Sequence, residues 1–283
     1  MDFMRHVSIH HSALLWVYTA LVVLGLLGYR ELQLQPDGKL HVHFLDVDQG
    51  DATLLVTPSG KQILIDGGPN MDTLEHLGRF LPFFDREIDL LVLTHPNADH
   101  LMALPDVLQR YHVQQILLSG ADYPLQRYKA MVQEILSRNI SVVLADPAKD
   151  IDMGDGTVLD VLWPGPEQLD NFDVNNASVV VRVLFGEHAI LLPGDIEEEA
   201  EIAMLLSGGD IRADVLKLPH HGSMSSSSTG LLLAVKPGLG IVSAGRNNRF
   251  GHPHAEVIER YENMGIPLRS TAKEGTISLT FTR

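Results

Sequence analysis

The chain has 283 residues and a formal net charge of −15, with 36 acidic and 21 basic residues. Such a charge argues against a general electrostatic attachment to nucleic acid, which needs a basic surface, although bound divalent metal ions would reverse the local charge of an active site. Cysteine is absent, which excludes disulfides, thiolate zinc sites and a cysteine nucleophile.

The N-terminal part is strongly apolar. No Asp, Glu, Lys or Arg occurs in residues 7–29, and a helix that spans a membrane needs about 20 such residues. We therefore predict a segment of residues 1–34 with one transmembrane helix, followed by a soluble domain of residues 35–283. A cleaved signal peptide is the alternative, although the apolar run ends in Leu26-Leu-Gly-Tyr-Arg-Glu31, which is a poor cleavage site.

The first part of the soluble domain begins with three short strands and continues with alternating strands and helices. The uniformly apolar run at residues 88–94 is typical of a buried strand. The predicted strands are residues 40–47, 52–57, 62–66, 88–94, 116–118 and 142–144, and the predicted helices are residues 71–80, 99–109 and 124–137.

The second part repeats this plan. The predicted strands are residues 157–163, 178–185, 188–192, 214–218, 240–243 and 275–282, and the predicted helices are residues 197–206, 227–235 and 254–264. Two β-rich halves that are each flanked by helices indicate an α+β fold, in which two sheets pack together with helices outside.

Histidine and carboxylate residues gather where predicted strands end. His95-Pro-Asn-Ala-Asp-His100 directly follows the buried strand of residues 88–94. Imidazole and carboxylate are good ligands for zinc or manganese. Alternatively, Asn97 or Asp99 only caps the helix that follows.

Two further motifs end apolar strands in the second half. Gly194-Asp195 presents a carboxylate at the rim of a sheet, where it can bridge two metal ions, or it forms an ordinary turn. Pro219-His-His-Gly-Ser223 places two adjacent histidines after a core strand, and Gly222 permits a close approach of the backbone to a ligand. An exposed loop with two surface histidines is the alternative.

Other loops supply polar groups. The loop of residues 246–254 contains Asn247 and Arg249, which are suited to binding a phosphate, although Pro253 also marks the loop as the entry to a helix. The remaining candidates either shape a turn or approach the site, namely Asp51, Asn176 and Ser178. Because several independent strand ends carry such residues, we predict that they form one site.

In this order, the motifs resemble the C-terminal metallo-β-lactamase-like domain of the ComEC family of competence DNA-uptake proteins. The resemblance covers residues 40–282. The matching strings are Phe44-Leu-Asp-Val-Asp-Gln-Gly-Asp-Ala52, Ile65-Asp-Gly-Gly68, Leu93-Thr-His-Pro-Asn-Ala-Asp-His100, Asn176-Ala-Ser178, Gly194-Asp195, Pro219-His-His-Gly-Ser223 and Gly251-His-Pro253.

The resemblance implies an αββα sandwich and a nuclease or phosphodiesterase that uses one or two divalent ions, Zn²⁺ or Mn²⁺. It implies one metal held by His95, Asn97 and Asp195. It implies a second held by Asp99, His100, Asp195 and one histidine of the 220/221 pair, for which we take His220. We assign catalysis to Asp99, His221 and His252, and substrate binding to Asp51, Asn176, Ser178, Gly222, Ser223, Asn247 and Arg249.

The sequence departs from the family pattern in three respects. Asn97 stands where the family usually has a carboxylate, so we expect the first metal to be held more weakly. Asp48 stands where the family usually has glycine, and Asp tolerates the left-handed backbone region better than most residues. The multi-span channel region of the family is not part of this sequence, so the chain is interpreted as a stand-alone relative, as the partner of a separate multi-span channel protein, or as a truncated copy.

These features predict a single-pass membrane protein that hydrolyses DNA during uptake, with its soluble domain on the extracytoplasmic side of the inner, cytoplasmic membrane. A different hydrolase on the same fold, such as a phosphocholine esterase, is an alternative that the net charge of −15 favours. A degenerate, non-catalytic partner of a membrane DNA channel is the third interpretation, which Asn97 keeps open.

Overall fold

The computed structural model describes residues 2–121, 123–165, 167–169 and 172–283, with side chains from residue 14 onward. The chain divides into two compact units. The smaller unit contains Met1–Gln35 and Gly78–Asp85, and the larger contains Pro36–Leu77 and Arg86–Arg283.

The smaller unit is built on one long helix, α1 (Asp2–Gln33). Its Leu14–Gln33 part is long and apolar enough to cross a membrane, and 0% of it is buried. A signal sequence near an N-terminus would have the same properties. Near the end of the helix, Arg30 donates hydrogen bonds to the carbonyl oxygens of Gly78 (2.6 Å) and Arg79 (3.0 Å). The side chains of residues 7–13, which belong to the predicted apolar segment, lie outside the described ones.

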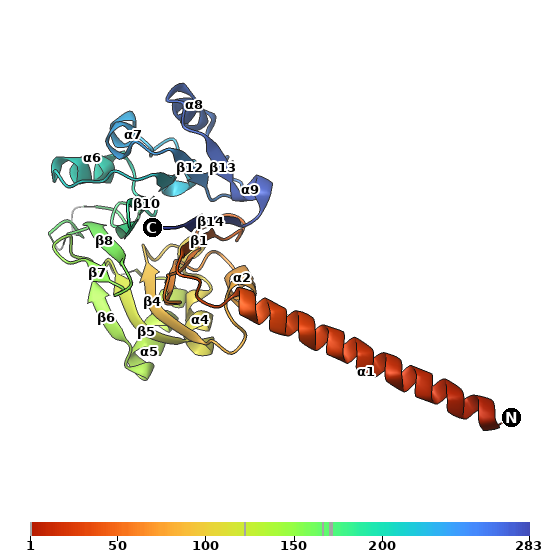
Figure 1. Cartoon of the computed structure of the whole chain (residues 1–283). Helices are drawn as coiled ribbons and strands as arrows, with labels where there is room; N and C mark the ends of the chain where they lie inside the picture. Colours follow the sequence, from red (N-terminus) through yellow and green to blue (C-terminus); the bar gives the residue numbers. More distant parts are fainter. Residues whose placement is uncertain (1, 122, 166, 170–171) are drawn as a thin grey trace. The chain divides into compact units, whose positions relative to one another are not determined.

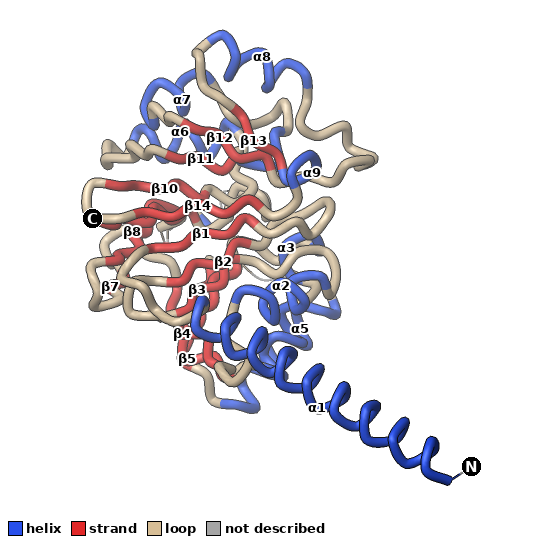
Figure 2. The backbone as a smooth tube through the Cα atoms, turned by 45° about the vertical axis from the view of Figure 1, so that its right-hand side comes forward, coloured by secondary structure: helices blue, strands red, loops and turns tan. Residues whose placement is uncertain are grey.

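The larger unit contains two seven-stranded sheets. In the first, β14 to β3 pair antiparallel and β3 to β6 pair parallel, and Figure 2 shows the strands from β14 to β5 side by side. The strands lie in the order β14 (Ile277–Phe281), β1 (Leu40–Phe44), β2 (Thr53–Val56), β3 (Gln62–Ile65), β4 (Glu87–Leu93), β5 (His112–Leu118) and β6 (Ser141–Leu144).

The second sheet is built in the same way from the second half of the chain. Strands β10 to β13 pair parallel, and β7 to β10 pair antiparallel. The order is β13 (Leu268–Ser270), β12 (Leu239–Val242), β11 (Val215–Lys217), β10 (His188–Leu192), β9 (Val180–Phe185), β8 (Thr157–Trp163) and β7 (Ile151–Asp152).

The alternation of side chains along each strand explains why the two sheets stack. In β10, Ile190 and Leu192 join a buried core with Phe44 of β1 and Val92 of β4. Leu191 points to the opposite face of the sheet and packs in a separate buried core, which includes residues of the helices that cover this face. Each face of this sheet therefore has its own apolar partner.

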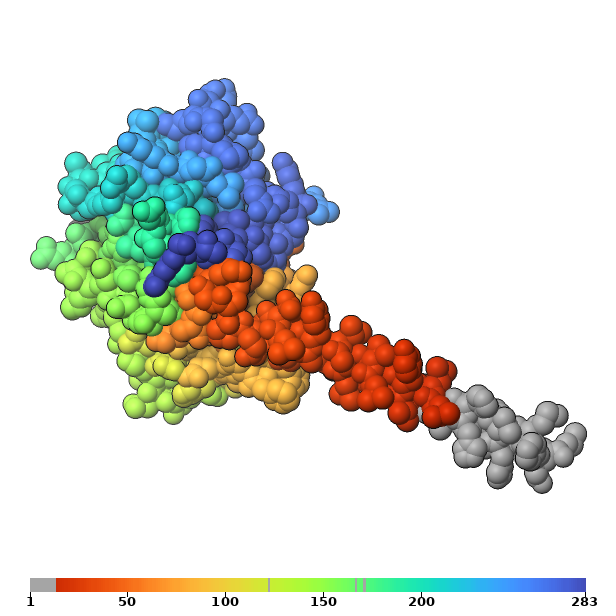
Figure 3. Space-filling view, in the orientation of Figure 1, coloured from red at the N-terminus to blue at the C-terminus, as the bar shows by residue number. Residues whose placement is uncertain are grey.

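Helices cover the outer faces of the sheets. On the side of the first sheet lie α2 (Asp72–Phe80), α4 (Leu104–Arg110) and α5 (Gln126–Arg138) (Figure 1). On the side of the second lie α6 (Glu198–Leu206), α7 (Thr229–Val235) and α8 (Ala255–Asn263). Within the larger unit the two halves of the chain form neighbouring layers, coloured orange to green and cyan to blue in Figure 3. The predicted sandwich of two sheets with helices outside is confirmed.

Some predicted elements differ in detail. The single helix expected over residues 99–109 is two helices, α3 (Ala98–Leu101) and α4, because Pro105 lies in the first turn of α4 and cannot continue a helix as an interior residue. The short elements β7, β13, α9 (Thr271–Glu274) and the 3₁₀ helix η2 (Pro219–Gly222) were not predicted, since segments of two to four residues have no readable periodicity.

Candidate metal centre

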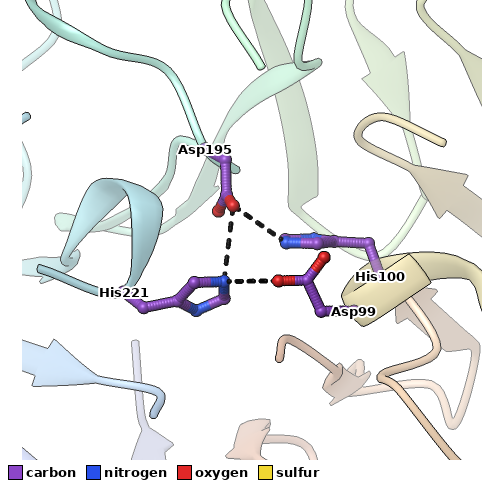
Figure 4. A group of neighbouring side chains, drawn as sticks. All are labelled: Asp99, His100, Asp195 and His221. Carbon is purple, nitrogen blue, oxygen red and sulfur yellow. Dashed lines mark ion pairs between the residues drawn. The ribbon is translucent and has the colours of Figure 1, made fainter. Parts of the chain in front are cut away.

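The histidines and carboxylates of the candidate site follow the ends of buried strands. His95, Asp99 and His100 come after β4, Asp195 follows β10, and His221 follows β11. Four of these residues form a compact group: Asp99, His100, Asp195 and His221 each offer a ligand atom, and all four atoms lie within 4.8 Å of one another (Figure 4). The fold therefore joins motifs that are far apart in the sequence.

Asp195 is central to this four-residue cluster. Its Oδ2 lies 3.2 Å from Nε2 of His100 and 3.3 Å from Nε2 of His221 (Figure 4). Nε2 of His221 also lies 3.4 Å from Oδ2 of Asp99. The side chains of His100, Asp195 and His221 are buried, whereas that of Asp99 is 30% exposed. Asp99 is thus the member of the cluster through which solvent or a substrate can reach it.

The three buried imidazoles are held through their Nδ1 atoms. Nδ1 of His100 lies 2.7 Å from Asp66, that of His221 lies 2.9 Å from the carbonyl oxygen of Ser243, and that of His95 lies 3.2 Å from the hydroxyl of Ser178. Among the described residues, the Nε2 atoms of these three histidines have no hydrogen-bond partner. A fixed Nδ1 and an unbonded, buried Nε2 are typical of histidines that bind a metal. The residues present therefore fit a divalent ion.

The charges of the cluster are strongly coupled. Burial alone would lower the pKa of His100 and His221. The carboxylate of Asp195, together with Asp66 for His100 and Asp51 for His221, outweighs burial and holds both pKa values well above the usual range. Conversely, these two histidines hold the pKa of Asp195 well below its usual range despite burial. The pKa of His95 falls to about 3, because the ring is buried beside His100. Groups of opposite charge are thus concentrated within this cluster.

The backbone around the second histidine motif is unusual. His220 and His221 have φ values of 47° and 55°, in the left-handed region that residues with a side chain seldom occupy. Gly222 follows with φ 83°, and a Cβ there would lie 2.6 Å from Cβ of Pro253. This strained turn directs His221 into the cluster. His220 lies beside it, with Nε2 3.9 Å from Asp195 and Nδ1 3.0 Å from Glu197.

The other predicted metal ligands occupy the rim of the cluster. Nε2 of His95 lies 3.9 Å from Oδ2 of Asp195. Asn97 is at the N-cap position of α3 but makes no capping hydrogen bond. Its amide group instead donates to Oδ1 of Asn175 at 2.7 Å. The capping alternative therefore does not account for the side chain of Asn97.

Several residues assigned to the substrate are buried and support the ligands. The hydroxyl of Ser178 contacts His95 and accepts a hydrogen bond from the amide of Asp195 at 3.1 Å. Oδ1 of Asn176 accepts a hydrogen bond from the amide of Glu197 at 2.8 Å. Both side chains thus brace the loop that carries Asp195.

The remaining assigned residues lie on the other side of the cluster or at the surface. The ring of His252 lies 5.5 Å from that of His220 and 6.1 Å from that of His221. Ser223 shares a hydrogen bond with Ser225 at 2.9 Å. Asn247 and Arg249 are exposed in the loop before α8.

Two buried residues were not predicted as part of the site. Asp66, which orients His100, accepts hydrogen bonds from the amide (2.8 Å) and the hydroxyl (2.7 Å) of Thr94. Lys217 of β11 contacts the carboxylate of Asp51 and lies 3.7 Å from Oδ1 of Asp195. The sequence does show Lys217 as a single cation within an apolar strand. A buried cation needs a buried anion as its partner, so this pattern could have indicated the role of Lys217.

The chain also resembles known proteins. Residues 45–246 match the metallo-beta-lactamase superfamily. Bacillus subtilis ComE operon protein 3 is 26% identical over 85% of this chain, Haemophilus influenzae recombination protein 2 is 31% identical over 85%, and Neisseria gonorrhoeae competence protein ComA is 28% identical over 92%. The chain spans 33%, 29% and 35% of these relatives, respectively. The resemblance to competence proteins is confirmed for this part of their length.

Solved structures share the fold at low sequence identity. The metallo-beta-lactamase fold protein YhfI from Bacillus subtilis superposes with a TM-score of 0.59 at 11% identity, over 86% of this chain and 100% of that one. Igni18, a metallo hydrolase from Ignicoccus hospitalis, gives a TM-score of 0.57 at 17% identity over 86% and 100%. Identities this low establish the architecture alone.

Proposed function

The chain belongs to the metallo-beta-lactamase superfamily, and from this premise we propose that it is a metal-dependent phosphodiesterase that hydrolyses DNA in connection with DNA uptake. The cluster of Asp99, His100, Asp195 and His221 carries the proposal, because it brings four ligand atoms together within 4.8 Å. The competence proteins among its relatives support DNA as the substrate.

We assign one ion, Zn²⁺ or Mn²⁺, to this four-residue cluster, with His221 in the place given to His220 from the sequence. A second ion would take His95, Asn97 and Asp195, with His220 beside it. A divalent ion held by such ligands would supply Lewis acidity and a bound water of lowered pKa. Since Asn97 is neutral, we expect the ion at His95 and Asn97 to be bound more weakly than the ion in the four-residue cluster.

The side chains around the ligands provide the remaining chemistry. Asp99 is ionised at neutral pH: burial would raise its pKa, but the neighbouring His221 and His100 together lower it to about 2. Its partly exposed carboxylate can therefore accept a proton from an attacking water. Burial and the neighbouring histidines lower the pKa of His252 to about 4. The neutral His252 ring then donates a hydrogen bond to a phosphate oxygen instead of transferring a proton.

The test is metal-dependent hydrolysis by the full chain in detergent. It should cleave a single-stranded oligonucleotide and bis-p-nitrophenyl phosphate with Mn²⁺ or Zn²⁺. Asp99→Ala should reduce the rate by about 10²–10⁴-fold, as expected for loss of a general base. Asp195→Ala should also abolish stoichiometric metal binding, whereas Asp152→Ala, at an exposed residue of β7, should change neither property.

Two outcomes would reject the proposal in different ways. Well under one equivalent of bound metal in the folded protein would favour a degenerate binding partner. Stoichiometric metal without cleavage of either phosphodiester would favour a hydrolase for another substrate class.

We further propose that α1 anchors the chain in the cytoplasmic membrane, with the larger unit on the extracytoplasmic side beside a multi-span channel protein. The exposed apolar helix supports the anchor. The relatives named for competence support a partner that takes part in DNA uptake. Protease added to intact spheroplasts should digest the larger unit, and protection of that unit would contradict this orientation.

A further inference from the structure

A planar stack of side chains leads from the surface to the four-residue cluster. The ring of Phe250 lies 5.6 Å from that of His252, with 24° between their planes. The ring of His252 lies 6.1 Å from that of His221, at 26°. The guanidinium carbon of Arg249 lies 4.9 Å from the centre of the Phe250 ring. Distances of this size between the centres of nearly parallel rings are typical of offset stacking.

The loop that carries Phe250 is held in one shape by the side chain of Asn248. Oδ1 of Asn248 accepts hydrogen bonds from the amides of Phe250 (3.1 Å) and His252 (3.0 Å). Its Nδ2 donates to the carbonyl oxygens of Gly245 (2.8 Å) and His252 (2.6 Å). With its amide group fully bonded, Asn248 presents a Phe250 side chain that is still 47% exposed. An exposed ring on a fixed loop is preorganised to receive a ligand.

The surroundings of this ring favour an anionic ligand. No Asp or Glu occurs in residues 215–255, although the whole chain has 36 acidic residues. A cavity of about 820 Å³ adjoins the loop, and Arg246, His252 and Lys273 are among the residues that line it. Two acidic residues also line it, namely Glu262 and Glu274, and Glu274 is paired with Arg269 at 2.6 Å. The loop is therefore locally basic in an acidic protein.

We propose that Phe250 is a stacking platform for an unpaired nucleobase, which positions a single-stranded nucleic acid with its phosphate backbone between Arg246, Arg249 and the metal centre. This inference rests on the proposed function, whose substrate it narrows from DNA in general to single strands. Every base offers a flat face to an aromatic ring, but a duplex keeps these faces covered by neighbouring bases. The same loop supplies both the ring and the cations, which matches the alternation of base and phosphate along one strand.

The experiment measures binding without hydrolysis. The full chain in detergent, with EDTA present, is titrated against a fluorescein-labelled single-stranded oligonucleotide and against an abasic chain of equal length. Phe250→Leu should weaken binding of the oligonucleotide by about 10-fold, within the range expected for one base stacked on one ring. Phe250→Trp should retain or strengthen binding. Phe84→Leu, at a ring that is 87% exposed elsewhere in the chain, should have no effect.

The abasic chain separates stacking from a general loss of the loop. Phe250→Leu should leave its affinity unchanged, because the phosphates and the cations remain. The stacking role of Phe250 would be wrong if Phe250→Leu weakened the binding of both ligands equally or of neither. It would also be wrong if the wild type bound a duplex more tightly than the single strand. Hydrolysis of bis-p-nitrophenyl phosphate by the wild type tests the proposed function separately, since that substrate has no base.

Discussion

Nδ1 of His100 lies 2.7 Å from Oδ2 of Asp66, and both side chains are buried. Because Thr94 donates two further hydrogen bonds to this carboxylate, Asp66 cannot turn away from the imidazole. The proton of His100 is therefore held on Nδ1, and Nε2 is directed to Asp195 at 3.2 Å. Asp66, which was not assigned to the site from the sequence, thus determines which nitrogen of His100 faces Asp195.

Asp66→Asn should weaken metal binding without removing a ligand. An amide group facing Nδ1 would favour the other tautomer of His100, with its proton on the atom that must bind the metal. Loss of such a supporting carboxylate typically reduces metal affinity by about 10–100-fold. Competition with a chromophoric chelator measures the affinity directly.

Asp89→Asn is the matched control, because Asp89 also accepts a backbone hydrogen bond, from the amide of Gln62 at 2.8 Å. It should leave the affinity for metal unchanged. If both variants bind metal like the wild type, the orienting role of Asp66 is wrong.

Lys217→Met should destabilise the fold. Lys217 and Asp51 are nearly fully buried and contact each other. The variant therefore leaves the buried carboxylate of Asp51 without Lys217, with His221 at 3.4 Å as a remaining partner. Removing one partner of a buried ion pair costs about 3–5 kcal/mol. Urea unfolding of the two proteins measures the difference.

A second substitution distinguishes lost charge from lost packing. Lys217→Met combined with Asp51→Asn should recover part of the stability, since the stranded charge is then gone. Lys129→Met, at an exposed position of α5, is the control and should be close to neutral. A double variant that is less stable than the single one would show that the charge pairing is not the cause.

The sequence predicted the sandwich and the polar strand ends, because both follow from local patterns. The burial alternation of β8 and the position of Asp195 after β10 are examples. The contacts between distant segments could not be predicted in this way. The pairing of Lys217 with Asp51 depends on the stacking of two sheets, and the choice between His220 and His221 depends on left-handed backbone angles that the residue types do not reveal. Asn176 and Ser178 were predicted from the sequence to shape a turn or approach the site, but the direction of their side chains toward supporting contacts needed the structure.

The stability of Glu201→Gln should increase relative to that of the wild type as the pH rises. Burial raises the pKa of Glu201 above 4.5, although its carboxylate accepts hydrogen bonds from the amides of Ser227 and Ser228. The folded protein therefore holds this proton more tightly than the unfolded chain. The stabilising contribution of the protonated group is complete below pH 4.5 and is lost as the pH rises through the pKa of the folded state.

Urea midpoints at pH 4.5 and at neutral pH test this difference. Because Gln does not titrate, the stability of Glu201→Gln relative to wild type should shift in favour of the variant at neutral pH. Glu199→Gln, on the exposed side of the same helix, should show no such shift. A shift in the opposite direction would mean that the two amides stabilise the ionised carboxylate more than burial destabilises it.

Asn97→Asp should strengthen the weaker of the two proposed metal positions. The substitution exchanges a neutral amide for a carboxylate at the position that we propose shares an ion with His95 and Asp195, and hard divalent ions prefer charged oxygen ligands. In the wild type, Oδ1 of Asn175 accepts a hydrogen bond from Asn97. If its amide group rotates by half a turn, Asn175 can donate a hydrogen bond to the new carboxylate instead. Metal content by mass spectrometry should rise from about one ion toward two.

The double variant Asn97→Asp with Asn175→Ala tests the role of the neighbour. It should bind the second ion less tightly than Asn97→Asp alone, because the carboxylate loses the donor that holds it in place. Asn139→Asp adds the same charge at the C-cap of α5, far from any ligand, and should leave the metal content at the wild-type value. If Asn97→Asp also leaves it there, then Asn97 is not a ligand position and the second ion has no basis in this chain.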